Sequence, residues 1–340
     1  MNEEIKSKNY HLLFIIKGQV KLQRSTWSDF FSVSSGTYLN DSDLLLPTSG
    51  SNIVVLCDDL NLWMVPSNVK SGVTNGCSKT TEPIITRPQG NIGNTRGTKD
   101  PTTPYVISPR STKIINSKPL IIWNPVPQTE KYIVQIEENG NLIWNAETDR
   151  TQISYPGEPN LKRETSYLVK IMSDTGISSE DNLSIDSTFK LINQTEEEEI
   201  TSLTEKISSL DLSSEQKDYA VAALYASKGF DAESNLLLDK IVANDTKNVQ
   251  AILNLGKGYL KIGLPLNAKT YFEKTIELAE TNNDIESMAQ AQEALAQTLL
   301  DIGRRDDGIQ MLLQAEASFK SLGDNKHSEK LKIMRIKITS

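Results

Sequence analysis

The sequence predicts a multidomain protein of the β plus α class, in which two small all-β domains precede an α-helical solenoid. Up to about residue 192, apolar and β-branched runs of strand length alternate with turn residues. From Glu196 onward the apolar period changes from two to about 3.6, and a helical pattern recurs after 34 residues. We therefore expect an all-β domain at 1–85, a linker at 86–104, a second β domain at 105–194 and helical repeats at 195–340.

The first segment has the strand pattern of a small β domain. Within Gly18–Gln23, apolar and polar residues alternate, which predicts a strand with one buried face and one face in water. Turn residues such as Ser35-Gly36 and Asp58-Asp59 separate the strand candidates. The candidates are Leu12–Leu22, Phe30–Val33, Asp43–Leu46, Ile53–Leu56 and Leu62–Val65.

Short motifs in this segment follow one another in a family-specific order. They are G-x-V at Gly18 and Val20, G-x-x-L at Gly36 and Leu39, D-x-L at Asp43 and Leu45, and then the strands Ile53–Cys57 and Leu62–Val65. This order resembles the FecR-like sensor domain, whose best-known members are periplasmic parts of signal-transducing membrane proteins. Proteins of cyanobacterial type that join such a domain to helical repeats are a closer likeness. The resemblance implies a sensing or binding domain.

The two cysteines leave two interpretations open. Cys57 lies in the apolar run Ile53–Cys57, which favours burial as a small hydrophobic residue. A Cys57–Cys77 disulfide is the alternative, and an oxidising compartment would favour it. A zinc site normally needs four ligands, and the histidines, His11 and His327, lie far from both cysteines in sequence. We expect no metal and no cofactor.

Residues 86–104 are rich in proline and glycine and contain almost no large apolar residue. Such a segment cannot bury enough surface to offset the entropy of ordering it, so we interpret it as a linker.

The second β domain contains the strongest hairpin signal, Asn139-Gly140. Its motifs Leu120–Pro127, Tyr132–Ile136 and Leu161–Tyr167 resemble a fibronectin type III or related immunoglobulin-like module. The resemblance implies a seven-strand sandwich with a tyrosine corner. We expect Trp123 and Tyr167 to be core residues. The strand candidates are Leu120–Trp123, Lys131–Glu137, Leu142–Ala146, Gln152–Tyr155, Ser166–Met172 and Thr188–Ile192.

The C-terminal region reads as repeated helical hairpins. Glu196–Glu199 open a helix, because acidic residues favour the positive end of its dipole. The best-formed unit has helices at Val249–Ile262 and Leu266–Thr281, separated by Gly263, which follows Gly229 by 34 residues. A third unit begins near Ala289, with extra residues around Asn283–Met288 that lengthen the turn or its helices. Lys330–Ile338 forms a last, capping helix.

These units resemble tetratricopeptide repeats, with the family's small and large residues at Gly256, Tyr259, Ala268 and Phe272. The resemblance implies a concave groove, lined by the first helix of each repeat, that binds a peptide or helix. Lys257 and Lys261 are either part of that site or a solvated face. The groove residues carried over by position are Tyr219, Leu253, Asn254, Lys257, Leu260, Lys261, Glu293 and Gln297.

The sequence favours a non-enzymatic scaffold or adaptor. It has two histidines and lacks a nucleophile elbow, a phosphate-binding loop and H-E-x-x-H. The net charge of −8 does not suit a nucleic-acid partner. We therefore expect a protein partner. The alternative is a regulatory or sensor subunit of a signalling assembly, including one built around a caspase-like protease.

The longest apolar run near the start, Leu12–Ile16, is too short to span a membrane and lacks the flanks of a secretory signal. We expect a soluble chain without membrane insertion. The expected location is cytoplasmic, or periplasmic if a leader was removed.

Overall fold

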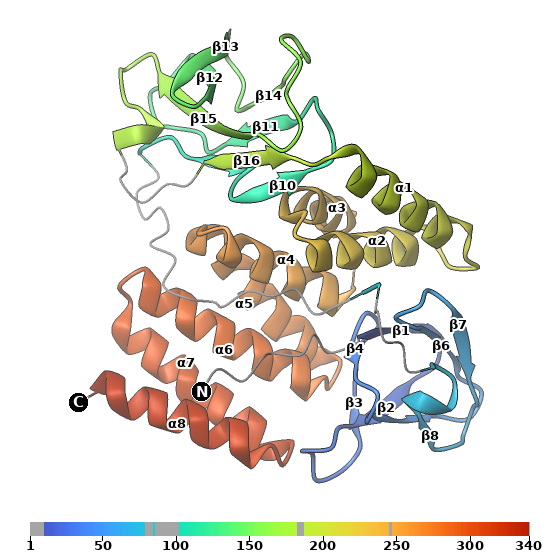
Figure 1. The fold of residues 1–340 in the computed structure, drawn as a ribbon. Coiled ribbons are helices and arrows are strands. Elements are labelled where there is room, and N and C mark those ends of the chain that lie inside the picture. The colour runs from blue at the N-terminus through green and yellow to red at the C-terminus, as the bar shows by residue number, and fades with distance from the viewer. Residues whose placement is uncertain (1–9, 79–83, 86–101, 182–186, 245–246, 340) are drawn as a thin grey trace, which may run out of the picture.

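The structure is a computed structural model that describes residues 10–78, 84–85, 102–181, 187–244 and 247–339. Its described part contains an N-terminal β unit, a second β unit and eight helices (Figure 1). The N-terminal β unit lies beside the helices, and the second β unit contacts α3 and the start of α1. The predicted fold class is confirmed. Most of the predicted linker, residues 86–101, lies outside the described residues.

The N-terminal β unit consists of two four-stranded sheets, ordered β4-β1-β6-β7 and β3-β2-β5-β8. The prediction of one strand over Leu12–Leu22 was wrong, because Gly18 adopts a φ of +84° and turns the chain between β1 and β2. The alternation in β2 is confirmed, with Val20 and Leu22 buried and Lys21 exposed. The strands are β1 (His11–Lys17), β2 (Val20–Gln23), β3 (Phe31–Ser32), β4 (Tyr38–Leu39), β5 (Leu44–Pro47), β6 (Asn52–Leu56), β7 (Leu62–Val65) and β8 (Ser71–Gly72), followed by the 3-10 turn η1 (Val73–Asn75).

At the central strands β1 and β6, the first of these sheets is buried on both faces. On one face, Leu13 and Val55 pack into the interior of the β unit. On the other face, Leu12 and Phe14 belong to a core that also contains helical residues, and the Phe14 ring meets the Tyr219 ring edge-on at 6.4 Å. The N-terminal β unit and the helices therefore share one hydrophobic core.

The second β unit is a sandwich of a five-stranded sheet, β10-β16-β15-β12-β13, and a three-stranded sheet, β14-β11-β9. The hairpin at Asn139-Gly140 is confirmed, since both residues have positive φ. Trp123 and Tyr167 are buried, as expected. The fibronectin type III identity stays a prediction. The strands are β9 (Val106–Ser108), β10 (Thr112–Ile114), β11 (Leu120–Trp123), β12 (Tyr132–Glu138), β13 (Asn141–Thr148), β14 (Gln152–Ser154), β15 (Ser166–Ser173) and β16 (Thr188–Leu191), with the 3-10 turn η2 (Ser179–Asp181) after β15.

The helices form antiparallel hairpins, and Gly229, Gly263 and Gly303 adopt left-handed backbone conformations at their turns. Only glycine does so without strain, which explains why these residues mark the repeat. Gly256 allows α5 to approach α4, because a Cβ there would lie 2.7 Å from the Phe272 ring. The helices are α1 (Gln194–Ser209), α2 (Ser214–Lys228), α3 (Asp231–Ala243), α4 (Val249–Lys261), α5 (Pro265–Thr281), α6 (Ile285–Asp301), α7 (Arg305–Ser321) and α8 (Asn325–Thr339).

The longer interval before the third hairpin is taken up by helix length. Helices α5 and α6 have 17 residues each, whereas α3 and α4 have 13 each. The turn between α5 and α6 remains short, and Asp284 caps α6 by accepting a hydrogen bond from the Ser287 backbone N–H. The insertion thus extends the wall of the array and leaves the hairpin geometry unchanged.

The sandwich contacts α3 and the start of α1 through β10 and the residue that follows it. Thr112 accepts a hydrogen bond from the Asp231 backbone N–H at 2.9 Å, and Lys113 forms an ion pair with Glu196. The Ile115 backbone N–H donates to Oε1 of Glu233 at 2.8 Å. The second carboxylate oxygen of Glu233 is buried and accepts no hydrogen bond from the residues that the structure describes.

We expect the free energy of unfolding to fall as the pH rises from about 4.5 to 7, because of the buried carboxyl of Glu233. Burial raises the pKa of this carboxyl to about 7, against the hydrogen bond from Ile115. The folded state therefore keeps its proton up to a higher pH than the unfolded state does. The proton on Glu233 contributes about 3 kcal/mol to the free energy of unfolding. This contribution is fully present below pH 4.5 and is lost as the pH rises through 7.

The test is the free energy of unfolding as a function of pH for the wild type and Glu233→Gln, which stays neutral throughout. The wild type should lose stability relative to the variant over this window. Parallel curves would show that Glu233 is solvated in the folded state.

Candidate functional site

The candidate site is a cleft of about 430 Å³ between the N-terminal β unit and the concave side of the helical array. One wall comes from the β unit and the other from α2, α3, α4, α6, the end of α7 and the start of α8. Aromatic, amide and charged side chains line both walls. They include Tyr10, Arg24, Trp27 and Tyr38 from the β unit, and Tyr219, Asn235, Gln250, Asn254, Lys257, Lys261, Glu286, Gln290, Glu293, Phe319 and His327 from the array.

The turn before β4 fills the middle of the concave surface. Tyr219 donates a hydrogen bond from its hydroxyl to the Gly36 carbonyl at 2.9 Å, and Asn254 donates to the Tyr219 hydroxyl at 2.7 Å. Gly36 has a φ of +90°, and a Cβ there would lie 3.0 Å or less from Tyr219 and Gln250. Burial, with a smaller contribution from Tyr38, raises the pKa of Tyr219. Tyr219 therefore acts as a neutral hydrogen-bonding residue that anchors the β unit.

The cap of α6 makes a second contact with the β unit. Oδ2 of Asp284 accepts hydrogen bonds from the Ser34 backbone N–H at 3.0 Å and from the Ser287 hydroxyl at 2.6 Å. Burial raises the pKa of Asp284 despite these donors. One carboxyl group thus both caps a helix and binds the backbone of the β unit.

Arg24 forms the ionic centre of this interface. Its Nε and Nη2 donate to the two carboxylate oxygens of Glu286 at 2.7 and 2.8 Å, and its Nη1 donates to Asp43 at 2.6 Å. Burial opposes the guanidinium charge, but Glu286 and Asp43 outweigh it and raise the pKa of Arg24. Burial raises the pKa of Asp43, with Arg24 acting in the opposite direction. Because two carboxylates share one guanidinium, the group is closely fixed in place.

The remaining charged groups in the cleft are held by neighbours on adjacent helices. Lys257 donates to the Gln290 side chain and Lys261 to Asp231, each at 2.7 Å. His327 lies 2.9 Å from Glu293 and against the Phe319 ring. Burial works to raise the pKa of Glu293, but His327, with Lys330 and Lys257, outweighs it and lowers this pKa. Glu293 therefore presents a negative charge at neutral pH.

The structure brings most of the predicted groove residues together. Tyr219, Asn254, Lys257, Lys261 and Glu293 line the cleft. The assignment of Leu253 and Leu260 to an open groove was wrong, because both are buried in the core shared with the β unit. Gln297 lies outside the lining residues and donates to Asp301 on its own helix. A binding role for these residues stays a prediction.

Several residues that line the cleft were not predicted from the sequence. His327 follows Glu293 by 34 residues, so the repeat period contained a signal for it. Arg24, Trp27 and Tyr38 carried no comparable signal, because nothing in the sequence shows that the β unit packs into the groove. The open groove expected from the repeats is instead partly occupied by the chain itself.

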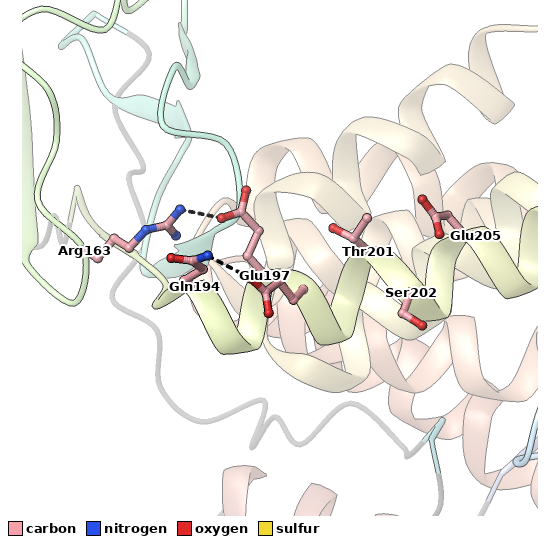
Figure 2. A pocket seen from close by; sticks show the side chains of 7 residues that line it. Arg163, Gln194, Glu197, Thr201, Ser202 and Glu205 are labelled. Atoms are coloured by element: carbon pink, nitrogen blue, oxygen red, sulfur yellow. Dashed lines mark hydrogen bonds and ion pairs between the residues drawn. The ribbon is translucent and has the colours of Figure 1, made fainter.

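A second, shallower hollow lies at the start of α1 (Figure 2). Arg163 from the sandwich forms an ion pair with Glu197 at its edge, at 2.6 Å. The other lining side chains are polar or acidic: Gln194, Glu198, Thr201, Ser202 and Glu205. The hollow is therefore an open acidic surface.

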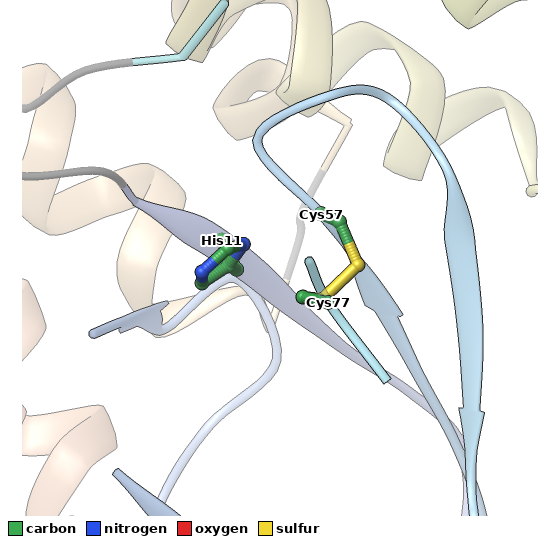
Figure 3. A group of neighbouring side chains, drawn as sticks. All are labelled: His11, Cys57 and Cys77. Atoms are coloured by element: carbon green, nitrogen blue, oxygen red, sulfur yellow. A yellow bond between two sulfur atoms is a disulfide. The ribbon is translucent and has the colours of Figure 1, made fainter. Parts of the chain in front are cut away.

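The cysteines form a disulfide, Cys57–Cys77, and His11 lies beside it (Figure 3). His11 is far from the cysteines along the sequence, as expected, but the fold brings it next to them. The Asp58 backbone N–H donates to Nδ1 of His11, so the proton resides on Nε2, which donates to Asp41 at 3.0 Å. Because each sulfur is bonded to the other, this group in its oxidised form is structural.

No helix among the described residues is both long enough and apolar enough to cross a membrane.

Comparison with known proteins gives likenesses to solved structures, among them helical-repeat proteins. No family model and no curated protein matches the chain. A Podosopora anserina putative kinesin light chain with TPR-like repeats is 16% identical, with a TM-score of 0.32, over 42% of this chain and 88% of its own. The N-terminal domain of stress-induced protein-1 from C. elegans is 18% identical, with a TM-score of 0.28, over 39% and 97%. YrrB, described as a TPR protein with an unusual peptide-binding site, is 19% identical, with a TM-score of 0.26, over 42% and 80%. At these scores the likenesses carry no argument about function.

Proposed function

We propose that this protein is a non-enzymatic interaction protein that binds an extended peptide segment of a partner in the cleft between its N-terminal β unit and its helical array. One observation carries the proposal: the cleft of about 430 Å³ is lined from both sides by aromatic and hydrogen-bonding side chains. Such a composition suits a polypeptide, which offers backbone donors and acceptors together with apolar side chains.

The amide side chains favour this occupant. Gln250, Asn254 and Gln290 lie on α4 and α6 along the helical wall. Gln250 donates to Ser287, Asn254 donates to Tyr219 and Gln290 accepts from Lys257. Each amide has further donor and acceptor sites beyond these bonds, and a peptide backbone offers the matching groups. Trp27 and Tyr38 on the opposite wall supply apolar surface for the side chains of the peptide.

Peptides selected from a random displayed library on the wild-type chain test the proposal. Lys257→Glu reverses a charge in the cleft beside Glu293, and we expect it to weaken the selected peptides by about tenfold or more. Lys247→Glu makes the same charge change in an exposed position before α4 and should leave binding unchanged. Failure to select any peptide, or equal binding by both variants, would contradict the proposal.

The absence of catalysis is part of the same proposal. His11 is fully buried, and His327 is held between Glu293 and Phe319. Mass spectrometry of the selected peptides after incubation with the protein should recover them intact. Cleavage at a defined bond would overturn this part and would identify the His327–Glu293 pair as the first group to examine.

A regulatory or sensor subunit of a signalling assembly is the second candidate. It is favoured by the direct bonds from Tyr219 and Asp284 to the β unit, since a change in that unit would reach the cleft. A protease gene next to this one would support the role, including a role beside a caspase-like protease, whereas an isolated gene would count against it. The Cys57–Cys77 disulfide favours an oxidising location, such as the periplasm, over the cytoplasm.

A further inference from the structure

The last helix of the array, α8, has apolar residues on two faces. Leu331, Met334 and Ile338 face the core. Ile333 and Ile336, one turn apart, are 47% and 50% exposed. A helix that ends a repeat array normally has a polar outer face, because no further helix covers it. The outer face of α8 is therefore more apolar than that of a helix that only caps an array.

The order of the hairpins shows what kind of element fits this face. Helices α2, α4 and α6 each pack against the helix that follows them, namely α3, α5 and α7. Within the described residues, α8 occupies the position of another first helix and no second helix follows it. At the other end, α1 follows strand β16 of the sandwich and precedes the first complete hairpin, α2 and α3. Within the described residues, α1 and α8 thus stand outside the three complete hairpins, and we call them the two half-hairpins.

The two half-hairpins carry opposite charge. Helix α8 contains five Lys or Arg residues and one Glu, a net charge of +4 with neutral histidine. Helix α1 contains five Glu residues and one Lys, a net charge of −4. Lys326 and Lys330 are exposed on α8, and Glu198 and Glu205 are exposed on α1. The whole chain has a net charge of −8, so the charge of α8 is opposite in sign to that of the chain.

We propose that α8 of one molecule binds α1 of a second copy of this chain, which completes a helical hairpin between them. The exposed isoleucines would enter the hollow beside α1, where Thr201 and Ser202 leave room between acidic side chains (Figure 2). Lys326 and Lys330 would face Glu198 and Glu205. The charges complement one another and the buried isoleucines supply the apolar contact.

The contact joins different surfaces of the two copies. Helices α1 and α8 lie at opposite ends of the array (Figure 1), so α8 cannot bind α1 of the same molecule. Such a head-to-tail contact produces a ring if the rotation between copies closes and a filament if it does not. This assembly leaves the peptide cleft on each copy and does not depend on it.

Sedimentation of the full chain over a range of concentrations tests the proposal. We expect the wild type to self-associate and to dissociate as salt is raised, because the contact is partly ionic. Ile333→Ser with Ile336→Ser, and separately Lys326→Glu with Lys330→Glu, should each weaken association by about tenfold or more. Met64→Ser removes a hydrophobic side chain that is 58% exposed on β7 and should leave association unchanged.

A charge exchange makes the test specific. Glu198→Lys with Glu205→Lys should also prevent self-association, and mixing this variant with Lys326→Glu/Lys330→Glu should restore assembly between unlike copies. A monomeric wild type at all concentrations would overturn the proposal. So would α8 variants that associate like the wild type, or two charge-reversed variants that fail to bind each other. Unfolding curves matching the wild type would show that the variants are folded.

Discussion

Replacement of Arg24 by alanine should destabilise the folded chain by about 3–5 kcal/mol, the range observed when one partner of a buried ion pair is removed. Arg24 binds Glu286 through two hydrogen bonds and Asp43 through a third. Without the guanidinium, two buried carboxylates would remain near each other with no cation between them. Each would have to take up a proton or draw water into the interface. Denaturant unfolding of the wild type and Arg24→Ala measures the difference.

Two comparisons separate the effect of charge from a loss of packing. Arg304→Ala removes an exposed arginine whose pair with Asp307 is solvated, and it should cost less than about 1 kcal/mol. Neutralising both acids in the Arg24→Ala background, as Asp43→Asn with Glu286→Gln, should recover part of the loss. If Arg24→Ala costs no more than Arg304→Ala, Arg24 does not hold the β unit in the groove.

Removal of the Cys57–Cys77 disulfide should cost about 3 kcal/mol, because the bond closes a loop whose ends are 20 residues apart and thereby limits the unfolded state. Both cysteines are almost fully buried, so a double Cys57→Ala, Cys77→Ala variant is a cleaner test than reduction. The measurement is the free energy of unfolding in the absence of reductant.

The reductant provides the control for this measurement. It should lower the stability of the wild type toward that of the double variant and leave the double variant unchanged. A double variant as stable as the oxidised wild type would mean that the loop is already ordered in the unfolded chain, or that the thiols are free in solution. Alkylation of the denatured, unreduced protein distinguishes these cases, since the disulfide form takes up no alkyl group.

The local elements of this fold could be predicted because their signals are local. Asn139-Gly140 accommodates the positive φ values of a tight hairpin, and Gly263 ends α4 in a left-handed turn, whatever the rest of the chain does. The 34-residue interval from Gly229 to Gly263 marked the hairpins for the same reason. Gly18 could have divided the first predicted strand, since it too has positive φ.

The burial of β1 and β6 was also indicated by the sequence. Both contain continuous apolar runs, Leu12–Ile15 and Ile53–Leu56, where a sheet with one wet face would alternate. Such runs are typical of a sheet that is covered on both faces. The pattern did not show that the covering layer would be the helical array, because apolar periodicity does not identify a partner surface.

The sequence by itself determined where most of the longer strands, the Asn139-Gly140 turn and the helical hairpins form, and that the helices repeat. Only the tertiary structure decided that the N-terminal β unit partly occupies the concave surface, that Leu253 and Leu260 are buried, and that Arg24 meets Glu286. The physical reason is separation along the chain: Gly36 and Tyr219 are 183 residues apart, and Arg24 and Glu286 are 262 apart. Contacts at such distances depend on how complete units pack, and no short pattern of residues specifies that packing.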